Sequence, residues 1–123
     1  MIRRGTKVAV LDNSTVRLLK CLTVVKRGPG AGRIGDIILG VVNREFFWRR
    51  SFTKRFFFAV VMSTKKNLFR ATGAYYVRFP RSGVLLLKED KESFFGTRFY
   101  ARVPLEIRKS AFKEICQFSR KTF

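Results

Sequence analysis

A run of aromatic and cationic residues at positions 46–58 is the part of the sequence whose composition most directly suggests a chemistry. The cations that stand among its aromatic side chains are Arg49, Arg50, Lys54 and Arg55. Arginine and lysine neutralise phosphates, and aromatic faces stack on unpaired bases at about 1 to 3 kcal/mol per base. Residues 56–58 more often begin a core strand in such a pattern, whereas Trp48 and Phe52 fit either interpretation. The segment therefore suggests contact with RNA whose bases are splayed out.

Groups for acid–base or metal catalysis are scarce in this chain. It has no histidine, and its eight Asp and Glu residues show no convergent spacing. Cys21 and Cys116 lie far apart and form no Cys-x-x-Cys pair that could hold zinc. We therefore expect two reduced, partly buried thiols, and we expect no enzyme activity, catalytic residue, metal or cofactor.

A glycine-rich segment at residues 28–35 contains the pattern Gly-x-Gly-x-x-Gly, formed by Gly30, Gly32 and Gly35. In a dinucleotide-binding fold this pattern follows a strand and opens a helix, and an acidic residue follows about 20 positions later. Here the segment runs into a strand-like sequence, and basic residues occupy the later position. The pattern therefore favours a flexible, basic hairpin loop over a nucleotide site.

The overall charge points to a polyanionic partner. The chain has 123 residues, with 27 Lys or Arg against 8 Asp or Glu, and its formal net charge is +19. A hydrophobic fraction of 46% is too high for a disordered basic tail. The longest apolar run, residues 56–62, is much shorter than the roughly 20 residues of a membrane-spanning helix. We expect one folded domain over residues 1–123, with no membrane span and no secretory signal peptide.

Short strands are expected to position these side chains. Period-two patterning predicts strands at residues 6–11, 18–25, 36–42, 56–63, 75–79 and 84–88, and the turn Asp12-Asn13-Ser14 should join the first two into a hairpin. This succession is typical of an all-β barrel or sandwich. After Pro104, the spacing of apolar residues predicts two short helices in the tail.

Three further groups of cations border the predicted elements. They are Lys65 and Lys66 after Thr64, Arg78 with Arg81, and Arg98 with Arg102. Any one group could be a solvated charge that aids solubility. All of them together, on so small and so positive a body, are better explained by a polyanion that offsets the self-repulsion.

The order of several motifs resembles the fourteenth protein of the large ribosomal subunit, in its bacterial type. The residues that carry the resemblance are Asp12-Asn13-Ser14 with Cys21, Gly35-Asp36-Ile37-Ile38, Ala59-Val60-Val61 through Thr64-Lys65-Lys66, Gly73 with Arg78-Phe79, Val84-Leu85-Leu86 and Gly96-Thr97-Arg98. They follow the family order over nearly the whole chain. The joint spacing of the Thr-Lys-Lys, Arg-Phe and Gly-Thr-Arg segments is the most specific part.

The resemblance implies a mainly β fold: a small five-stranded β-barrel with a projecting β-ribbon over about residues 1–100, and a short helical C-terminal segment over about residues 101–123. It also implies a structural constituent of the large ribosomal subunit. Such proteins bind large-subunit rRNA and contact the third and nineteenth large-subunit proteins. They also help to form bridges to small-subunit rRNA, and a ribosome silencing factor can dock on them.

The predicted site residues combine the resemblance with the basic groups. The predicted RNA-binding residues are Arg3, Arg4, Arg49, Arg50, Lys54, Arg55, Thr64, Lys65, Lys66, Arg70, Arg78, Arg81 and Arg98. The residues expected at the subunit interface are Thr97, Arg98, Arg102 and Lys113.

Composition also suggests where the protein is made. Abundant phenylalanine, absent histidine and an arginine-rich surface are typical of a biased organellar genome, so we expect a mitochondrial, organelle-encoded ribosomal protein. A plastid or bacterial origin is the alternative. Two rival functions are a free-standing, OB-like protein that binds single-stranded nucleic acid and a peripheral protein of anionic membranes that uses residues 46–58.

Overall fold

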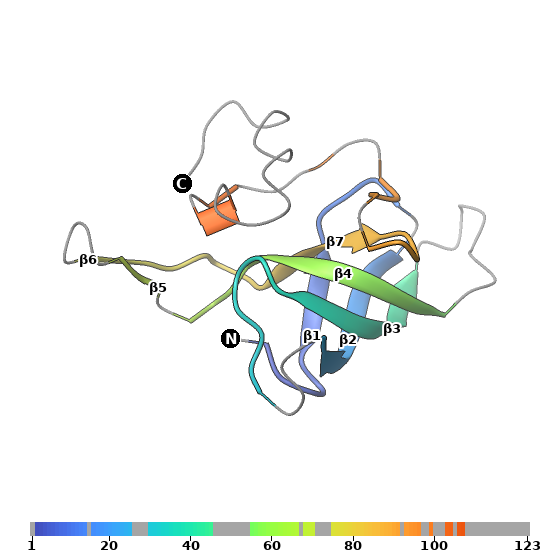
Figure 1. Cartoon of the computed structure of the whole chain (residues 1–123), viewed down its shortest axis with the longest axis horizontal. Coiled ribbons are helices and arrows are strands. Elements are labelled where there is room, and N and C mark those ends of the chain that lie inside the picture. The colour runs from blue at the N-terminus through green and yellow to red at the C-terminus, as the bar shows by residue number, and fades with distance from the viewer. Residues whose placement is uncertain are drawn as a thin grey trace.

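The computed structural model describes residues 2–14, 16–25, 30–45, 55–66, 68–70, 75–91, 93–96, 99, 103–104 and 106–107. The strands are β1 (Lys7–Val10), β2 (Val16–Val24), β3 (Ile37–Glu45), β4 (Phe56–Ser63), β5 (Leu68–Arg70), β6 (Tyr75–Val77) and β7 (Gly83–Leu87). Five of them, β1, β2, β3, β4 and β7, form a closed barrel, and β5 pairs with β6 in a separate ribbon. Figure 1 shows the ribbon projecting from one end of the barrel.

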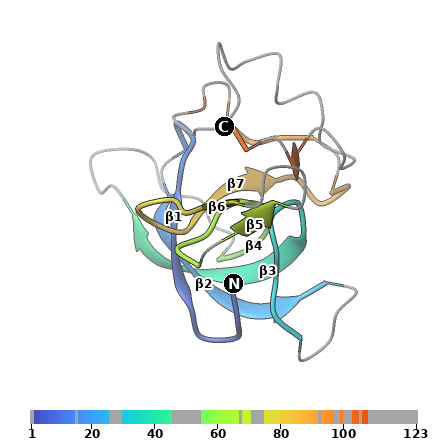
Figure 2. The same ribbon diagram turned by 90° about the vertical axis from the view of Figure 1, so that its left-hand side faces the viewer.

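The barrel is a meander, because each of its strands is antiparallel to the one before it. Five strands that alternate in direction leave the first and the last pointing the same way, so the pair that closes the barrel has to be parallel. β1 and β7 do pair in parallel, with Ala9 opposite Gly83 and Val10 opposite Val84. In Figure 2 the strands curve around a common centre, with the ribbon toward the viewer. The expectation of a mainly β barrel is confirmed.

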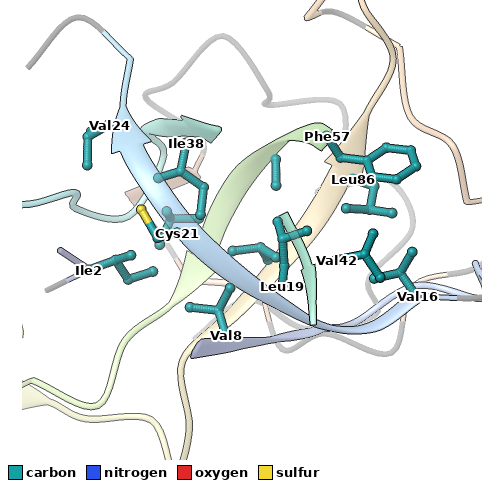
Figure 3. Close-up of a cluster of buried hydrophobic side chains, with 13 residues drawn as sticks. Ile2, Val8, Val16, Leu19, Cys21, Val24, Ile38, Val42, Phe57 and Leu86 are labelled. Atoms are coloured by element: carbon teal, nitrogen blue, oxygen red, sulfur yellow. The ribbon is translucent and has the colours of Figure 1, made fainter. Parts of the chain in front are cut away.

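Alternate residues of the strands fill the barrel interior. Phe57, Ala59 and Val61 of β4 and Val84 and Leu86 of β7 belong to one buried cluster. The other members of this cluster, all labelled in Figure 3, are Ile2, Val8, Val16, Leu19, Cys21, Val24, Ile38 and Val42. Fully burying an aliphatic or aromatic side chain stabilises a fold by about 1.5 to 3 kcal/mol, so this cluster holds the strands together.

A second apolar cluster covers the outer face of β4 and β7. It contains Val60 and Met62 of β4 and Leu85 and Leu87 of β7, and Val103 and Ile107 from the C-terminal part of the chain pack with them. Both faces of these two strands are therefore buried. This double burial explains why residues 56–62 read as a continuous apolar run and not as an alternating one.

The turn at Asp12 links the β1–β2 hairpin to β7. Asp12 is buried, its Oδ1 accepts the backbone N–H of Ser14 at 2.9 Å, and its Oδ2 accepts the N–H of Leu86 at 3.3 Å. Gly96 lies so close that a Cβ there would be 2.6 Å from Asp12 Cβ. The predicted Asx turn is confirmed, and its carboxylate also ties the hairpin to the seam that closes the barrel.

The six strands expected from the sequence are all present, and β4 matches its predicted bounds of residues 56–63 at both ends. The pattern missed β5, because three residues are too few to show a period. In the tail, Glu106 and Ile107 lie in a 3₁₀ turn in which the N–H of Ile107 donates to the carbonyl of Pro104 at 3.2 Å. The rest of the predicted helical tail lies outside the described residues.

Candidate nucleic-acid interface

Cations gather at the end of the barrel that bears the ribbon, which we call the ribbon end. The meander brings together here the first residues of β1, β3 and β7 and the last residues of β2 and β4. The exposed cations at or near this end are Arg3, Arg4, Lys7, Lys20, Arg33, Lys65, Lys66, Arg78 and Arg81. Among the described residues up to position 91, Asp36 is the one carboxylate at this end, and its Oδ2 accepts the backbone N–H of Arg33 at 2.7 Å.

The centre of the ribbon end is the place where the ribbon leaves the barrel. Two segments, residues 64–66 and 78–82, run side by side there, and we call them the neck. The N–H of Phe79 donates to the carbonyl of Thr64 at 3.4 Å, and Ser63 Oγ donates to the carbonyl of Arg81 at 3.0 Å. The neck therefore holds four exposed cations close together, namely Lys65, Lys66, Arg78 and Arg81.

Two buried side chains anchor the neck. Phe79 is 7% exposed and Thr64 is 5% exposed, and the Thr64 hydroxyl donates to the carbonyl of Lys66 at 3.5 Å. The sequence predicted Thr64 as an RNA contact, but its side chain points into the protein and bonds the backbone of its own turn. Its geometry favours a positioning role for the two lysines that follow.

A tight turn presents Arg3 and Arg4 beside the start of β1. The N–H of Thr6 donates to the carbonyl of Arg3 at 3.0 Å, and the N–H of Arg3 donates to Thr6 Oγ1 at 3.1 Å. Gly5 has a φ of 88°, a left-handed conformation that glycine adopts without strain. Before the turn, buried Ile2 exchanges two backbone hydrogen bonds with Gly32, so the turn is fixed to the β2–β3 loop.

Not all the predicted site residues lie at this end. Arg55 is exposed at the beginning of β4, and the full length of that strand separates it from the neck. Arg70 ends β5 in the ribbon, where the structure describes its backbone. Several others lie outside the described residues, namely Arg49, Arg50, Lys54, Thr97, Arg98, Arg102 and Lys113.

Three cations of the ribbon end were missed by the sequence analysis, namely Lys7, Lys20 and Arg33. Lys7 and Lys20 each stand beside a residue that points into the barrel, Val8 and Leu19, so they face outward. This alternation was readable in the sequence. What a single sequence does not show is which outward-facing residues of different strands are neighbours.

Other kinds of site find little support in the described part of the chain. Within it, no group of three or more His, Cys, Asp or Glu residues is placed to hold a metal ion, and no helix has the length and hydrophobicity needed to cross a membrane. Cys21 is a free, buried thiol, and burial raises its pKa. Cys21 was predicted to be reduced and partly buried; it is a free thiol, as expected, and its burial is complete. Cys116 lies outside the described residues.

A closed five-stranded meander with its cations gathered around a projecting ribbon defines a small, basic β-barrel protein. Comparison with family models specifies the class further, because the model described as Ribosomal protein L14p/L23e matches residues 1–123, the whole chain. The chain therefore belongs to this ribosomal protein family, as the order of its motifs predicted. It is a structural protein of the large ribosomal subunit, in a family that is typically non-enzymatic.

Proposed function

We propose that this chain binds large-subunit rRNA through its ribbon end and so fixes the position of RNA segments in the large subunit. The observation that carries the proposal is the neck, where four exposed cations are held together by backbone and side-chain hydrogen bonds. Membership of a ribosomal protein family supports rRNA as the partner. The net charge of +19 repels itself in the isolated chain, and a polyanion such as RNA would offset this repulsion.

The mechanism is scaffolding. Lys65, Lys66, Arg78 and Arg81 would neutralise phosphates and release counterions, which favours binding without reading base sequence. Because both neck segments are hydrogen-bonded to each other and anchored by Thr64 and Phe79, little backbone entropy is lost when RNA binds. A rigid arrangement of cations selects an RNA by the spacing of its phosphates, that is, by its shape.

Finer parts of the expected function remain proposals. We propose that residues Thr97, Arg98, Arg102 and Lys113 face the subunit interface and contribute to a bridge to small-subunit rRNA. We also propose contacts with the third and nineteenth large-subunit proteins, docking of a ribosome silencing factor, and a mitochondrial ribosome as the location. These proposals are supported by the sequence motifs and by composition.

The strand order bears on the rival OB-like function. An OB-fold is a Greek-key barrel, whereas this barrel is a meander closed by parallel pairing of β1 and β7. The topology therefore does not favour a free-standing OB-like protein that binds single strands.

Salt-dependent binding to purified large-subunit rRNA tests the proposed function. The variant Lys65→Gln with Arg78→Gln should weaken binding and lower the slope of log Kd against log salt by about 1.5, because two phosphate contacts are lost. The matched control is Lys88→Gln with Lys91→Gln, which removes the same charge at the opposite end of the barrel, next to Glu89 and Asp90. Equal slopes for the two variants would place the neck away from phosphate.

A further inference from the structure

Lys7 and Lys20 face each other across β1 and β2 on the outer wall of the barrel. They are register partners in this antiparallel pair, and both are exposed. The next pair, Val8 and Leu19, points inward and is fully buried, so the two lysines share the outer face. The Cβ atoms of directly opposite residues in an antiparallel pair are about 4.5 to 5.5 Å apart. Two ammonium groups therefore extend from neighbouring points of the sheet.

This arrangement is unfavourable for the isolated protein. Like charges placed directly opposite each other destabilise a strand pair. Within the described part of the chain, no carboxylate pairs with either lysine, and the residue opposite Lys20 on β3 is Val41. An anion held between the two ammonium groups would turn this repulsion into attraction.

The lysine pair is continuous with the neck. Ala9 lies opposite Gly83 in the parallel pair of β1 and β7, and the N–H of Ala9 donates to the carbonyl of Ser82 at 3.1 Å. Lys7 and Arg81 each stand two residues before a member of this pair, Lys7 before Ala9 and Arg81 before Gly83. Through Lys7 the pair thus reaches the strand next to the neck segment that contains Arg81, and the turn at Arg3 and Arg4 comes directly before β1.

We propose that Lys7 and Lys20 form a phosphate site that seats the RNA backbone on the β1–β2 wall and extends the contact surface of the neck around the barrel. This inference rests on the proposed function, since it takes large-subunit rRNA as the ligand. It assigns a binding role to two residues that lie outside the sequence-predicted set. It also explains why a repulsive pair is present on a wall that a neutral side chain would stabilise.

The test compares Lys7→Gln with Lys20→Gln, as a double variant, against Lys88→Gln with Lys91→Gln. Binding to purified large-subunit rRNA is measured across a salt series. Loss of two phosphate contacts should lower the slope of log Kd against log salt by about 1.5 and weaken binding about 30-fold near 0.1 M salt. The control variant should keep the slope of the wild type.

Thermal unfolding of the free proteins gives a second readout, in which the variant that binds RNA more weakly is expected to be more stable. The Lys7/Lys20 variant should unfold at a Tm about 1 to 4 °C above the wild type in low salt, because the repulsion is gone. The gain should shrink at about 1 M salt, where the screening length is about 3 Å. The control should show no gain, because its lysines stand beside Glu89 and Asp90 and Lys91 Nζ lies 4.7 Å from the centre of the Phe58 ring.

The two proposals fail in different ways. If the wild type binds rRNA and the neck variant weakens it, while the Lys7/Lys20 variant binds like the control, the phosphate site is wrong and the proposed function stands. If the neck variant also binds like the control, the proposed function fails with it. An unchanged Tm at low salt would contradict the repulsion on which this inference depends.

Discussion

Asp12 offers the sharpest test of how the barrel is closed. β1 and β7 share two register pairs, and beyond them the N–H of Leu11 donates to the carbonyl of Val84 at 2.9 Å. The next donor along β7, the N–H of Leu86, is accepted by the Asp12 carboxylate and not by a backbone carbonyl. The side chain of Asp12 therefore lengthens a short seam, and its other oxygen holds the turn through Ser14.

The variant Asp12→Ala removes both acceptors. A hydrogen bond to a charged group contributes about 1.5 to 3 kcal/mol, and the two bonds here measure 2.9 and 3.3 Å, so we take the lower value for each. The free energy of unfolding should fall by about 3 kcal/mol, with much of the loss arising from the buried N–H of Leu86. For a chain of this size, Tm should fall by roughly 10 to 15 °C.

Urea and thermal unfolding followed by circular dichroism would measure this loss, in enough salt to screen the self-repulsion of the chain. Asp90→Ala is the matched control, because Asp90 is exposed and accepts the N–H and the hydroxyl of Ser93 at 3.1 and 3.0 Å. It should lower the free energy of unfolding by less than about 1 kcal/mol. Equal losses for the two variants would refute the role of Asp12 in the seam.

Three further predictions follow from the packing. Gly40→Ala should lower the free energy of unfolding by about 1 to 3 kcal/mol, because a Cβ there would lie 2.5 Å from Leu19 Cγ and 3.0 Å from the backbone oxygen of Lys20. Urea unfolding would measure this loss. If the clash with Leu19 is the cause, Gly40→Ala should cost less in a Leu19→Ala background. Gly5→Ala should lower the free energy of unfolding by about 1 kcal/mol, because the backbone φ of +88° strains any residue with a Cβ, although that Cβ would meet nothing within 4 Å. Gly5→Asn should lower it less in the same assay. Equal losses for the two variants would argue against backbone strain. Burial raises the pKa of the Cys21 thiol, so in a Cys116→Ser background iodoacetamide should label the native protein at pH 8 at least about tenfold more slowly than the urea-unfolded protein. The raised pKa also sets how stability depends on pH. The fold favours the protonated thiol, so the contribution of Cys21 to the free energy of unfolding is complete below the pKa of the unfolded thiol and declines as the pH rises toward the pKa of the folded thiol. Unfolding measured between about pH 7 and 10 should show this decline in the wild type and not in Cys21→Ala.

Much of the fold was readable from local pattern. Alternation located β1, β2 and β3, and the Asx turn at Asp12 was predicted because its side-chain chemistry is local. The pattern did not show that β4 and β7 are buried on both faces, since the residues that cover them, Val103 and Ile107, come from a distant part of the chain.

The sequence predicted single residues of the site but not which of them lie close together. The motif positions Lys65 and Arg78 could be named from the sequence, but their proximity depends on the backbone bonds of the neck. Lys7 and Lys20 look like ordinary solvated charges within their own strands. Only the register of β1 against β2 makes them neighbours.

Fractionation of a native lysate on a sucrose gradient, with and without ribonuclease, tests the central claim most directly. Mass spectrometry would follow this protein through the fractions. The account predicts near-stoichiometric recovery with the large subunit and with monosomes, and release of the protein after nuclease treatment. Recovery mainly at the top of the gradient, or flotation with lipid that survives nuclease, would contradict it.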